Sequence, residues 1–355
     1  MIVKQFKYFP FLLKLNAPFQ NSSNIITERK GFIISMMDEQ ENISYAECSP
    51  LPGFSSETFD DVETILKGLR FQLQGFSFKD DLHSISEFLS EFKLVPSLRF
   101  ALEQVILNLI VRREKDFLVE HLGKFNSNIP VNAVMGFGKQ EDIISSISKK
   151  YGKGFRTFKI KIGRESFEDD FRLIENIHEK FGDTINLRLD VNGKWSLEAA
   201  VKYSFLLNMF NIQYIEEPCK GILNISSLAE SSPIPIAVDE SFHSINEAKQ
   251  IIQQSKIDFI IFKPTILGAL IGAVDFIKEF ENCGKRIIIS SSFESAVGKS
   301  ALVMLAALTG HLYAHGLDIS NIFANDICTD FYETINGYIS FDPHFYPPLF
   351  DLIFK

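Results

Sequence analysis

The sequence predicts an α/β protein in which a closed barrel of alternating strands and helices follows a smaller α+β domain. The main observation is a series of short apolar runs, separated by amphipathic stretches, that begins near residue 129. The centres of eight such runs lie 23 to 29 residues apart, close to the roughly 30 residues of a strand-helix-strand unit. Eight units fit a (β/α)8-type barrel. An open doubly wound sheet is the alternative, because periodicity alone does not establish closure.

Residues 1–95 lack this repeat, which is the second observation. Their first half contains apolar segments typical of β-hairpins, and two helical segments follow. We therefore expect an α+β domain over residues 1–96, a catalytic barrel over 97–320, and a C-terminal segment over 321–355 that returns to the first domain. An amphipathic helix predicted over residues 97–114 joins the first two parts.

Each apolar run predicts one barrel strand. In chain order the runs are IPVNAVM (129–135), TFKIKIG (157–163), NLRLDVN (186–192), IQYIEEP (212–218), PIAVDES (235–241), FIIFKPT (259–265), RIIISSS (286–292) and AHGLDIS (314–320). Helix-like segments lie between them, for example over 166–182, 196–210, 244–256 and 268–280. Several of these segments begin with Ser or Gly, which are favourable N-cap residues.

Composition excludes several classes of function. The net charge is -9 and no basic stripe is present, so a nucleic-acid partner is not expected. The four cysteines are widely spaced, which argues against a disulfide framework or a zinc cluster. No apolar run is long enough to span a membrane, and the first residues do not resemble a signal peptide. We expect a soluble cytoplasmic protein that acts on a small molecule; the sequence leaves its oligomeric state open.

The most informative residues are Lys159 and Lys161 in the second run. Side chains alternate faces along a strand, so both ammonium groups point the same way. Carboxylates follow at the ends of the next three runs, at Asp190, Glu216 and Asp239, and Lys263 ends the sixth. The C-terminal ends of barrel strands meet at one face, where the catalytic residues of barrel enzymes lie.

This pattern predicts metal-assisted proton abstraction. Three carboxylates that leave coordination positions open are typical of Mg²⁺ sites. Lys263 lies four strands from Lys161 and would face it across the barrel mouth. A lysine acts as a base only when it is neutral, and a like charge two residues away, a metal ion and burial all favour the neutral amine.

Each residue also has an ordinary structural interpretation. Two lysines can mark a solvated edge strand, and Asp190 before VNG fits a turn. Asp239 can cap a helix, and Lys263 can extend along apolar surface to reach solvent. Their coincidence at successive strand ends favours a site instead, because barrel enzymes place their chemistry there.

The motifs KIK, RLDVNGKW, YIEEP, AVDES and FIIFKP occur in an order and spacing that resemble the enolase superfamily, in its muconate-lactonising-enzyme subgroup. Two loops, SPLPGFSSET (49–58) and ISSSFESAVG (289–298), resemble those of o-succinylbenzoate synthases, dehydratases of menaquinone biosynthesis. The resemblance implies a modified (β/α)7β barrel with an N-terminal capping domain, and Mg²⁺ as the cofactor, for which Mn²⁺ can substitute. A lysine or histidine base with Mg²⁺ is general in this superfamily.

The resemblance also implies roles for the strand-end residues. Asp190, Glu216 and Asp239 would bind Mg²⁺, and Lys161 would be the base. It would remove the proton α to the carboxylate of 2-succinyl-6-hydroxy-2,4-cyclohexadiene-1-carboxylate and then protonate the departing hydroxyl, giving o-succinylbenzoate. Lys263 would stabilise the intermediate. Lys159 would be a third catalytic residue, which tunes Lys161 and contacts the substrate carboxylate. Residues that would support these groups without binding the metal are Asn192, Arg188, Glu217 and Glu240.

Two loops would hold the rest of the substrate. Residues Ser291, Ser292, Phe293 and Glu294 precede a predicted helix, whose first N–H groups can bind the succinyl carboxylate. An ordinary N-cap is the alternative interpretation. Pro52, Gly53 and Phe54 would form a loop that closes over the site, or a simple Pro-Gly turn.

Three other functions are compatible with these residues. An N-acylamino acid racemase or dipeptide epimerase would use one lysine on each face of its substrate. A metal-free aldolase would form a Schiff base on Lys263. A barrel that only binds an acidic ligand is the third, although the intact lysines and carboxylates argue against it.

Overall fold

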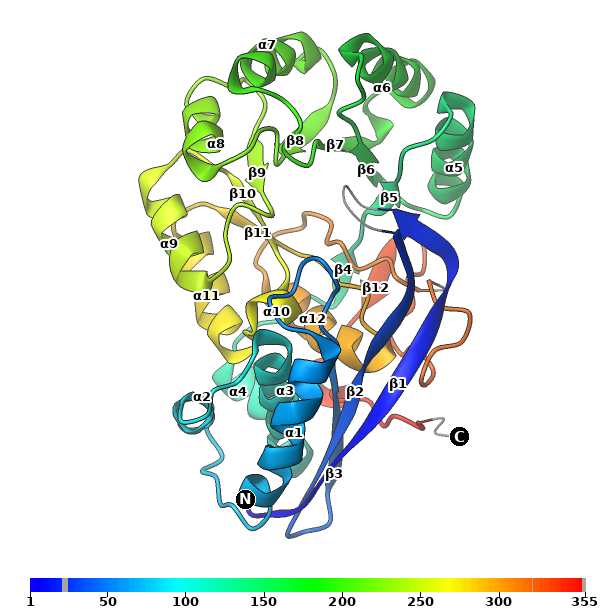
Figure 1. Cartoon of the computed structure of the whole chain (residues 1–355). Helices are drawn as coiled ribbons and strands as arrows, with labels where there is room; N and C mark the ends of the chain where they lie inside the picture. The colour runs from blue at the N-terminus through cyan, green and yellow to red at the C-terminus, as the bar shows by residue number, and fades with distance from the viewer. Residues whose placement is uncertain (21–24, 321, 353–355) are drawn as a thin grey trace.

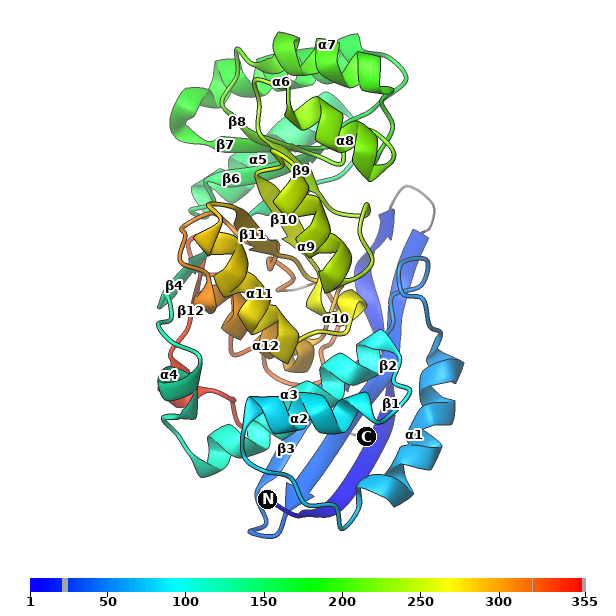
Figure 2. The same cartoon turned by 90° about the vertical axis from the view of Figure 1, so that its left-hand side faces the viewer.

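The computed structural model describes residues 1–20, 25–320 and 322–352. It consists of a parallel barrel and an antiparallel sheet that lies beside the barrel, with helices between the two (Figures 1 and 2). The predicted fold class is confirmed.

Within the described residues, the barrel sheet has seven parallel strands, each hydrogen-bonded to the next in chain order. They are β5 (Ala133–Met135), β6 (Thr157–Lys161), β7 (Asn186–Asp190), β8 (Ile212–Glu216), β9 (Ile236–Val238), β10 (Phe259–Phe262) and β11 (Arg286–Ile289). Nearly all of their residues are buried. This explains the continuous apolar runs, because a parallel sheet is covered on both faces.

The eighth predicted strand, residues 314–320, closes the barrel through single bridges. His315 pairs in parallel with Val131 on one side, and Gly316 pairs in parallel with Ser290 on the other. Backbone hydrogen bonds of 2.8 to 3.0 Å join this segment to both neighbours. A Cβ on Gly316 would lie 2.8 Å from Oγ of Ser290, so close pairing requires the glycine. The alternative of an open sheet is therefore wrong.

Helices cover the outside of the barrel (Figure 1). They are α5 (Gln140–Gly152), α6 (Phe167–Phe181), α7 (Leu197–Leu207), α8 (Ile222–Ala229), α9 (Ile245–Gln254), α11 (Ile271–Asn282) and α12 (Ala296–Leu308). Ser196 and Ser244 cap α7 and α9 as predicted. The described part of the chain contains no helix with the length and apolar content needed to cross a membrane.

Two predicted elements differ in the structure. The helix predicted from residue 268 begins at Ile271, because Gly268 adopts a left-handed φ of 66° and ends the short helix α10 (Pro264–Leu267). The first apolar run, predicted as one strand, forms two. Its first half, β4 (Asn128–Pro130), pairs antiparallel with β12 (Tyr338–Ser340), and its second half forms β5 of the barrel sheet.

The N-terminal sheet contains β1 (Val3–Gln20), β2 (Ile25–Asp38) and β3 (Ile43–Cys48) in antiparallel order. The helices of this part are α1 (Phe59–Leu73), α2 (Leu82–Ser90), α3 (Pro96–Arg113) and α4 (Phe117–His121). Helix α3 was predicted to be amphipathic, but it is buried along nearly its whole length. It lies between the sheet and the barrel and is covered from both sides (Figure 2).

The C-terminal segment contacts the N-terminal sheet. Phe323 bridges Leu15 of β1, and Phe323 and Phe350 belong to a buried cluster with Leu13 and Ile33. These contacts agree with the predicted return of the chain to its first domain. The domain boundaries remain a prediction, and residue 321, where the last boundary falls, lies outside the described residues.

Candidate active site

The register of the barrel strands brings the predicted residues together. Lys161 on β6 lies beside Asp190 on β7, which lies beside Glu216 on β8. Asp239 follows β9 directly, and Lys263 follows β10. The sequence places these side chains at strand ends because each apolar run ends there, and parallel strands end on one side of the barrel.

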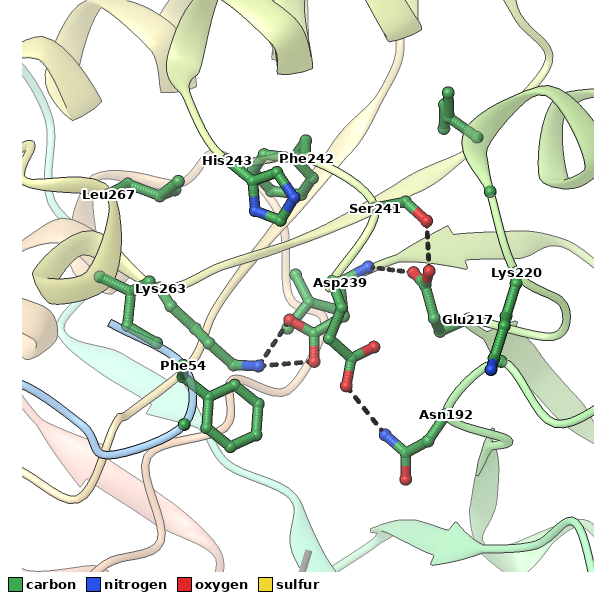
Figure 3. Close-up of a pocket in the computed structure, with 17 residues that line it drawn as sticks. Phe54, Asn192, Glu217, Lys220, Asp239, Ser241, Phe242, His243, Lys263 and Leu267 are labelled. Carbon is green, nitrogen blue, oxygen red and sulfur yellow. Dashed lines mark hydrogen bonds and ion pairs between the residues drawn. The ribbon is translucent and has the colours of Figure 1, made fainter. Parts of the chain in front are cut away.

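The lysines and carboxylates make short ion pairs. Nζ of Lys159 lies 2.6 Å from Oε1 of Glu216 and 3.1 Å from Oδ2 of Asp190. Nζ of Lys263 lies 2.6 Å from both carboxylate oxygens of Asp239, as Figure 3 shows. All of these side chains are at least largely buried. The positive charges offset part of the repulsion between these carboxylates. Burial, aided by Asp190 and Asp239, still raises the pKa of Glu216 well above its usual range.

Lys161 has a different environment from Lys159, although both come from one strand. Its Nζ donates to Oδ1 of Asn192 at 2.8 Å and lies 3.5 Å from Asp190. It is 6% exposed. Lys161 thus has one neutral acceptor and one longer carboxylate contact, whereas Lys159 contacts two carboxylates directly.

The electrostatics of the site keep Lys159, Lys263 and Asp190 charged. Burial alone would lower the pKa of Lys159, but the neighbouring carboxylates outweigh it and hold that pKa well above its usual range. Burial also opposes the charge of Lys263, yet Asp239 and Glu240 raise its pKa. Both lysines therefore remain cations. Burial would raise the pKa of Asp190, but Lys159 and Lys161 lower it, so Asp190 remains a carboxylate.

The predicted supporting residues contact this cluster. Nδ2 of Asn192 donates to Oε1 of Glu240 at 3.0 Å, and Oε2 of Glu217 accepts from the backbone N of Asp239 at 2.9 Å. Asn192 and Glu217 both have positive φ values, 50° and 43°. Such backbone strain in residues other than glycine is concentrated at functional sites. Burial raises the pKa of Glu217 to about 7.

Arg188 lies one pleat below Asp190 inside the barrel and is fully buried. It donates to Gln213, Asn132 and the carbonyl of Ala314, and its guanidinium lies 4.8 Å from the ring centroid of Tyr214. Its hydrogen bonds thus stay in the interior of the barrel, and among the described residues none of them reaches Asp190, Glu216 or Asp239.

A cavity of about 570 Å³ opens over β8, β9 and β10. Of the predicted site residues, Gly53, Phe54, Asn192, Glu217, Asp239, Glu240 and Lys263 line it. Lys159, Lys161, Asp190 and Glu216 are not among the lining residues. Sequence reasoning missed a second group that also lines it: Lys220, Ile222, Ser241, Phe242, His243, Ile266 and Leu267. These residues lie two to six positions after Glu216, Asp239 or Lys263, and that spacing is the signal present in the sequence.

The two predicted substrate loops differ in their relation to this cavity. The ring centroid of Phe54 lies 5.5 Å from Nζ of Lys263, so Phe54 covers the lysine (Figure 3). Pro52 is exposed and is not part of the cavity wall. The residues of the second loop, 291–294, do not line the cavity either. Its Ser292 amide donates to Glu294 inside the loop, at 2.7 Å. A substrate role for either Pro52 or residues 291–294 stays a prediction.

The carboxylates can accept a divalent cation, although they do not surround a common point here. Within the described ranges, no three Asp, Glu, His or Cys side chains are arranged as a metal shell. Lysine ammonium groups contact all three carboxylates instead. Oδ1 of Asp190 and Oε2 of Glu216 are nevertheless buried without a hydrogen-bond partner. Two unpartnered carboxylate oxygens on adjacent strands suit a hard cation, which prefers oxygen ligands.

Comparison with protein families defines the class. Residues 143–343 match the model of enolase C-terminal domain-like proteins, and residues 3–105 match the MenC N-terminal domain. The first match covers more than half of the chain. The protein belongs to the enolase C-terminal domain-like family and is an enolase-superfamily enzyme.

Its relatives include both predicted activities. The chain is 25% identical over 358 residues to an o-succinylbenzoate synthase of Pasteurella multocida, covering 98% of each protein. It is 26% identical over 343 residues to a D-Ala-D/L-Ala epimerase of Cytophaga hutchinsonii, covering 92% of this chain and 89% of the relative. It is also 26% identical over 303 residues to Protein PHYLLO of Arabidopsis thaliana, covering 79% of this chain but only 18% of that longer protein.

Solved structures confirm the fold. An N-succinyl Arg/Lys racemase from Bacillus cereus superposes with a TM-score of 0.86 at 22% identity, over 96% of this chain and 93% of the other. A muconate lactonizing enzyme from Pseudomonas fluorescens superposes with a TM-score of 0.85 at 19% identity, over 96% and 94%. At these identities the match concerns the fold alone.

Proposed function

We propose that the protein is an o-succinylbenzoate synthase. It would dehydrate 2-succinyl-6-hydroxy-2,4-cyclohexadiene-1-carboxylate to o-succinylbenzoate, a step of menaquinone biosynthesis, with a divalent cation as cofactor. The observation that carries the proposal is the placement of Lys161, three carboxylates and Lys263 at the ends of successive barrel strands. The match of the N-terminal part to the MenC N-terminal domain supports this activity over others of the superfamily.

Asp190, Glu216 and Asp239 would hold the cation, Mg²⁺ by preference. A bound divalent cation supplies positive charge beside the substrate carboxylate and so stabilises the negative charge that develops there. The unpartnered oxygens of Asp190 and Glu216 support this assignment.

Lys161 would act as base and then as acid. Its amine takes the proton α to the carboxylate, and the electron pair of that C–H bond moves into the ring. The same ammonium then donates the proton to the hydroxyl, which leaves as water when the C–O bond breaks. One group can serve both steps because both bonds lie on one face of the ring.

Lys159 and Lys263 would remain cations throughout, since nearby carboxylates raise the pKa of each. Lys159 would stabilise the carboxylate cluster, and Lys263 would lie against the ring as negative charge spreads over it. Phe54, which covers Lys263 in this structure, would move aside for the substrate or pack against it, excluding water.

Racemisation or epimerisation is the second candidate function. The epimerase relative, at 26% identity and similar coverage, favours it as a specific alternative. The same two lysines would then act on opposite faces of one carbon, which requires Lys263 to give up a proton. The raised pKa of Lys263 makes this harder without a bound metal ion. The same raised pKa argues against a Schiff-base aldolase, which needs a neutral amine.

The deciding experiment assays purified protein with the cyclohexadiene substrate, with and without Mg²⁺, and in parallel with N-succinyl amino acids in deuterated water. We expect metal-dependent formation of o-succinylbenzoate. Solvent deuterium incorporated at Cα of the amino acids, with no dehydration, would replace the synthase assignment by a racemase. Activity that survives EDTA and is trapped by borohydride would favour the aldolase.

A further inference from the structure

A buried arginine connects the two loops predicted to hold the substrate. Arg29 lies on β2 and is 1% exposed. Its guanidinium donates to three backbone carbonyls: from Nη2 to Ser49 at 2.8 Å, from Nη1 to Pro50 at 2.7 Å, and from Nε to Phe293 at 3.2 Å. The first two carbonyls begin the loop 49–56, and the third lies in the loop that follows β11. One side chain of the N-terminal sheet therefore binds both loops.

Glu47 extends this connection to the helix after the second loop. It lies on β3, is 1% exposed, and accepts from Oγ of Ser49 at 2.6 Å. The same carboxylate accepts from the backbone N of Ser295 at 2.8 Å and of Gly298 at 3.2 Å, at the beginning of α12. A carboxylate is favourable at this end of a helix, where N–H groups lack partners.

Glu294 completes the network on the barrel side and is also 1% exposed. It accepts from Oγ of Ser291 at 2.6 Å and from Oγ1 of Thr265 at 2.7 Å. Thr265 lies two residues after Lys263. The buried polar contacts thus continue from the N-terminal sheet, through the loop after β11, to the turn that carries Lys263.

The conformation of the second loop depends on these contacts. Phe293 has a φ of 63°, a left-handed conformation that costs a residue other than glycine roughly 1 kcal/mol or more. Its carbonyl accepts from Arg29, and its N–H donates to Oγ of Ser291 at 2.9 Å. Such a strained residue persists only where its surroundings hold it.

We propose that Arg29 is a positioning residue. It fixes loop 49–56, which carries Phe54 above Lys263, relative to loop 290–295, and thereby sets the shape of the substrate cavity. A guanidinium suits this role because its planar fork reaches several carbonyls at fixed angles, whereas a lysine ammonium is a point charge on a flexible chain. The kinetic consequence rests on the proposed function; the structural consequence does not.

The test compares Arg29→Lys with Arg112→Lys. Arg112 is a partly buried arginine of α3 whose Nη2 donates to the carbonyl of Pro348 at 3.0 Å, away from both loops. Hydrogen exchange is measured across loops 49–56 and 290–295 of each full-length variant. We expect Arg29→Lys to speed exchange in both loops at least about tenfold, since each lost bond to a charged donor is worth that much. Arg112→Lys should leave both loops unchanged.

The kinetic arm uses the cyclohexadiene substrate with Mg²⁺. Arg29→Lys should raise KM at least about tenfold and change kcat less than about threefold, because substrate fit is altered and the catalytic lysines are not. An effect on kcat alone would overturn the positioning role. If the wild-type protein does not dehydrate this substrate, the proposed function fails, and the exchange result still decides the role of Arg29.

A measurement on the wild-type protein covers the case in which Arg29→Lys does not fold. Native-state hydrogen exchange at increasing urea concentration reports which segments open together. Loops 49–56 and 290–295 should open as one unit with the same free energy. Independent opening of the two loops, or faster exchange in only one of them in the variant, would overturn the proposal.

Discussion

At the scale of single residues, the site depends on how differently two lysines of one strand are surrounded. Lys159 contacts two carboxylates at 2.6 and 3.1 Å, whereas Lys161 donates to the neutral amide oxygen of Asn192. A charged acceptor stabilises an ammonium far more than a neutral acceptor does. This difference in contacts supports the proposed assignment of Lys161, and not Lys159, as the base.

Lys161→Ala is therefore expected to keep its fold and its metal affinity and to lose at least about 10²-fold in turnover, the usual contribution of a general base. Steady-state kinetics measure the turnover, the dependence of the rate on Mg²⁺ concentration reports the metal affinity, and circular dichroism checks the fold. Lys194→Ala is the matched control, because Lys194 is an exposed lysine of the loop after β7, and its Nζ lies 4.2 Å from the ring centroid of Phe137. Near-normal dehydration by Lys161→Ala would remove Lys161 from the proposed role.

Glu47 gives a prediction about pH. Burial is the main cause that raises its pKa from 4.5 to about 7. Between about pH 4.5 and 7, the folded state keeps a proton on Glu47 that the unfolded state has lost. The contribution of Glu47 to stability is therefore complete below about pH 4.5 and is lost as the pH rises through about 7. The difference in free energy of unfolding, wild type minus Glu47→Gln, should fall by about 3 kcal/mol over this range. Urea titrations at several pH values measure it, and a difference that rises with pH would contradict the assignment.

At the scale of elements, the beginning of α12 shows how tightly the two parts of the protein fit. A Cβ at Gly298 would lie 2.9 Å from Oε2 of Glu47 and 2.8 Å from Cβ of Glu294. By contrast, a Cβ at Gly68 on the exposed side of α1 would meet no atom within 4 Å. Both glycines lie in helices, but a Cβ would meet close neighbours at Gly298 and open space at Gly68.

Gly298→Ala should lower the free energy of unfolding by about 1–3 kcal/mol, as overpacking does. Gly68→Ala should raise it by up to about 1 kcal/mol, because alanine favours the helix and restricts the unfolded chain. Chemical denaturation of the two variants measures both effects. Equal effects at the two positions would show that the contact between Glu47 and α12 is looser than this structure indicates.

The elements also show where sequence patterns are reliable. The predicted helix over 97–114 corresponds to α3 at Pro96–Arg113, since its apolar pattern is long and a proline begins it. The run 129–135 was misassigned as one strand, because both of its halves are apolar and its division depends on β12, about two hundred residues away. Local patterns cannot reveal a partner at that distance.

At the scale of the whole molecule, a metal ion that binds only the folded protein should stabilise it. At a Mg²⁺ concentration 100 times its dissociation constant, the expected gain is about 2.7 kcal/mol. Thermal unfolding with Mg²⁺ and with EDTA measures this shift. Asp190→Asn should abolish it, while Glu63→Gln, which alters an exposed ion pair on α1, should retain it. An equal response of both variants would place the metal elsewhere.

Local sequence patterns were enough to predict the order of the parallel strands and the polar residues at their ends. Strand order in a parallel barrel follows chain order, and a motif at the end of each strand must reach the same mouth. Asp190, Glu216 and Asp239, with the three lysines, could therefore be placed on one face from local patterns alone.

Three features follow from contacts between distant segments: the closure of the barrel, the walls of the cavity and the positions of the two loops. The barrel closes through single bridges of His315 and Gly316. The loop after β11 is held by a hydrogen bond from Arg29 to Phe293, which lie 264 residues apart in the chain. Such contacts form between segments whose own sequences carry no trace of their partner. Folding alone brings them within hydrogen-bonding distance.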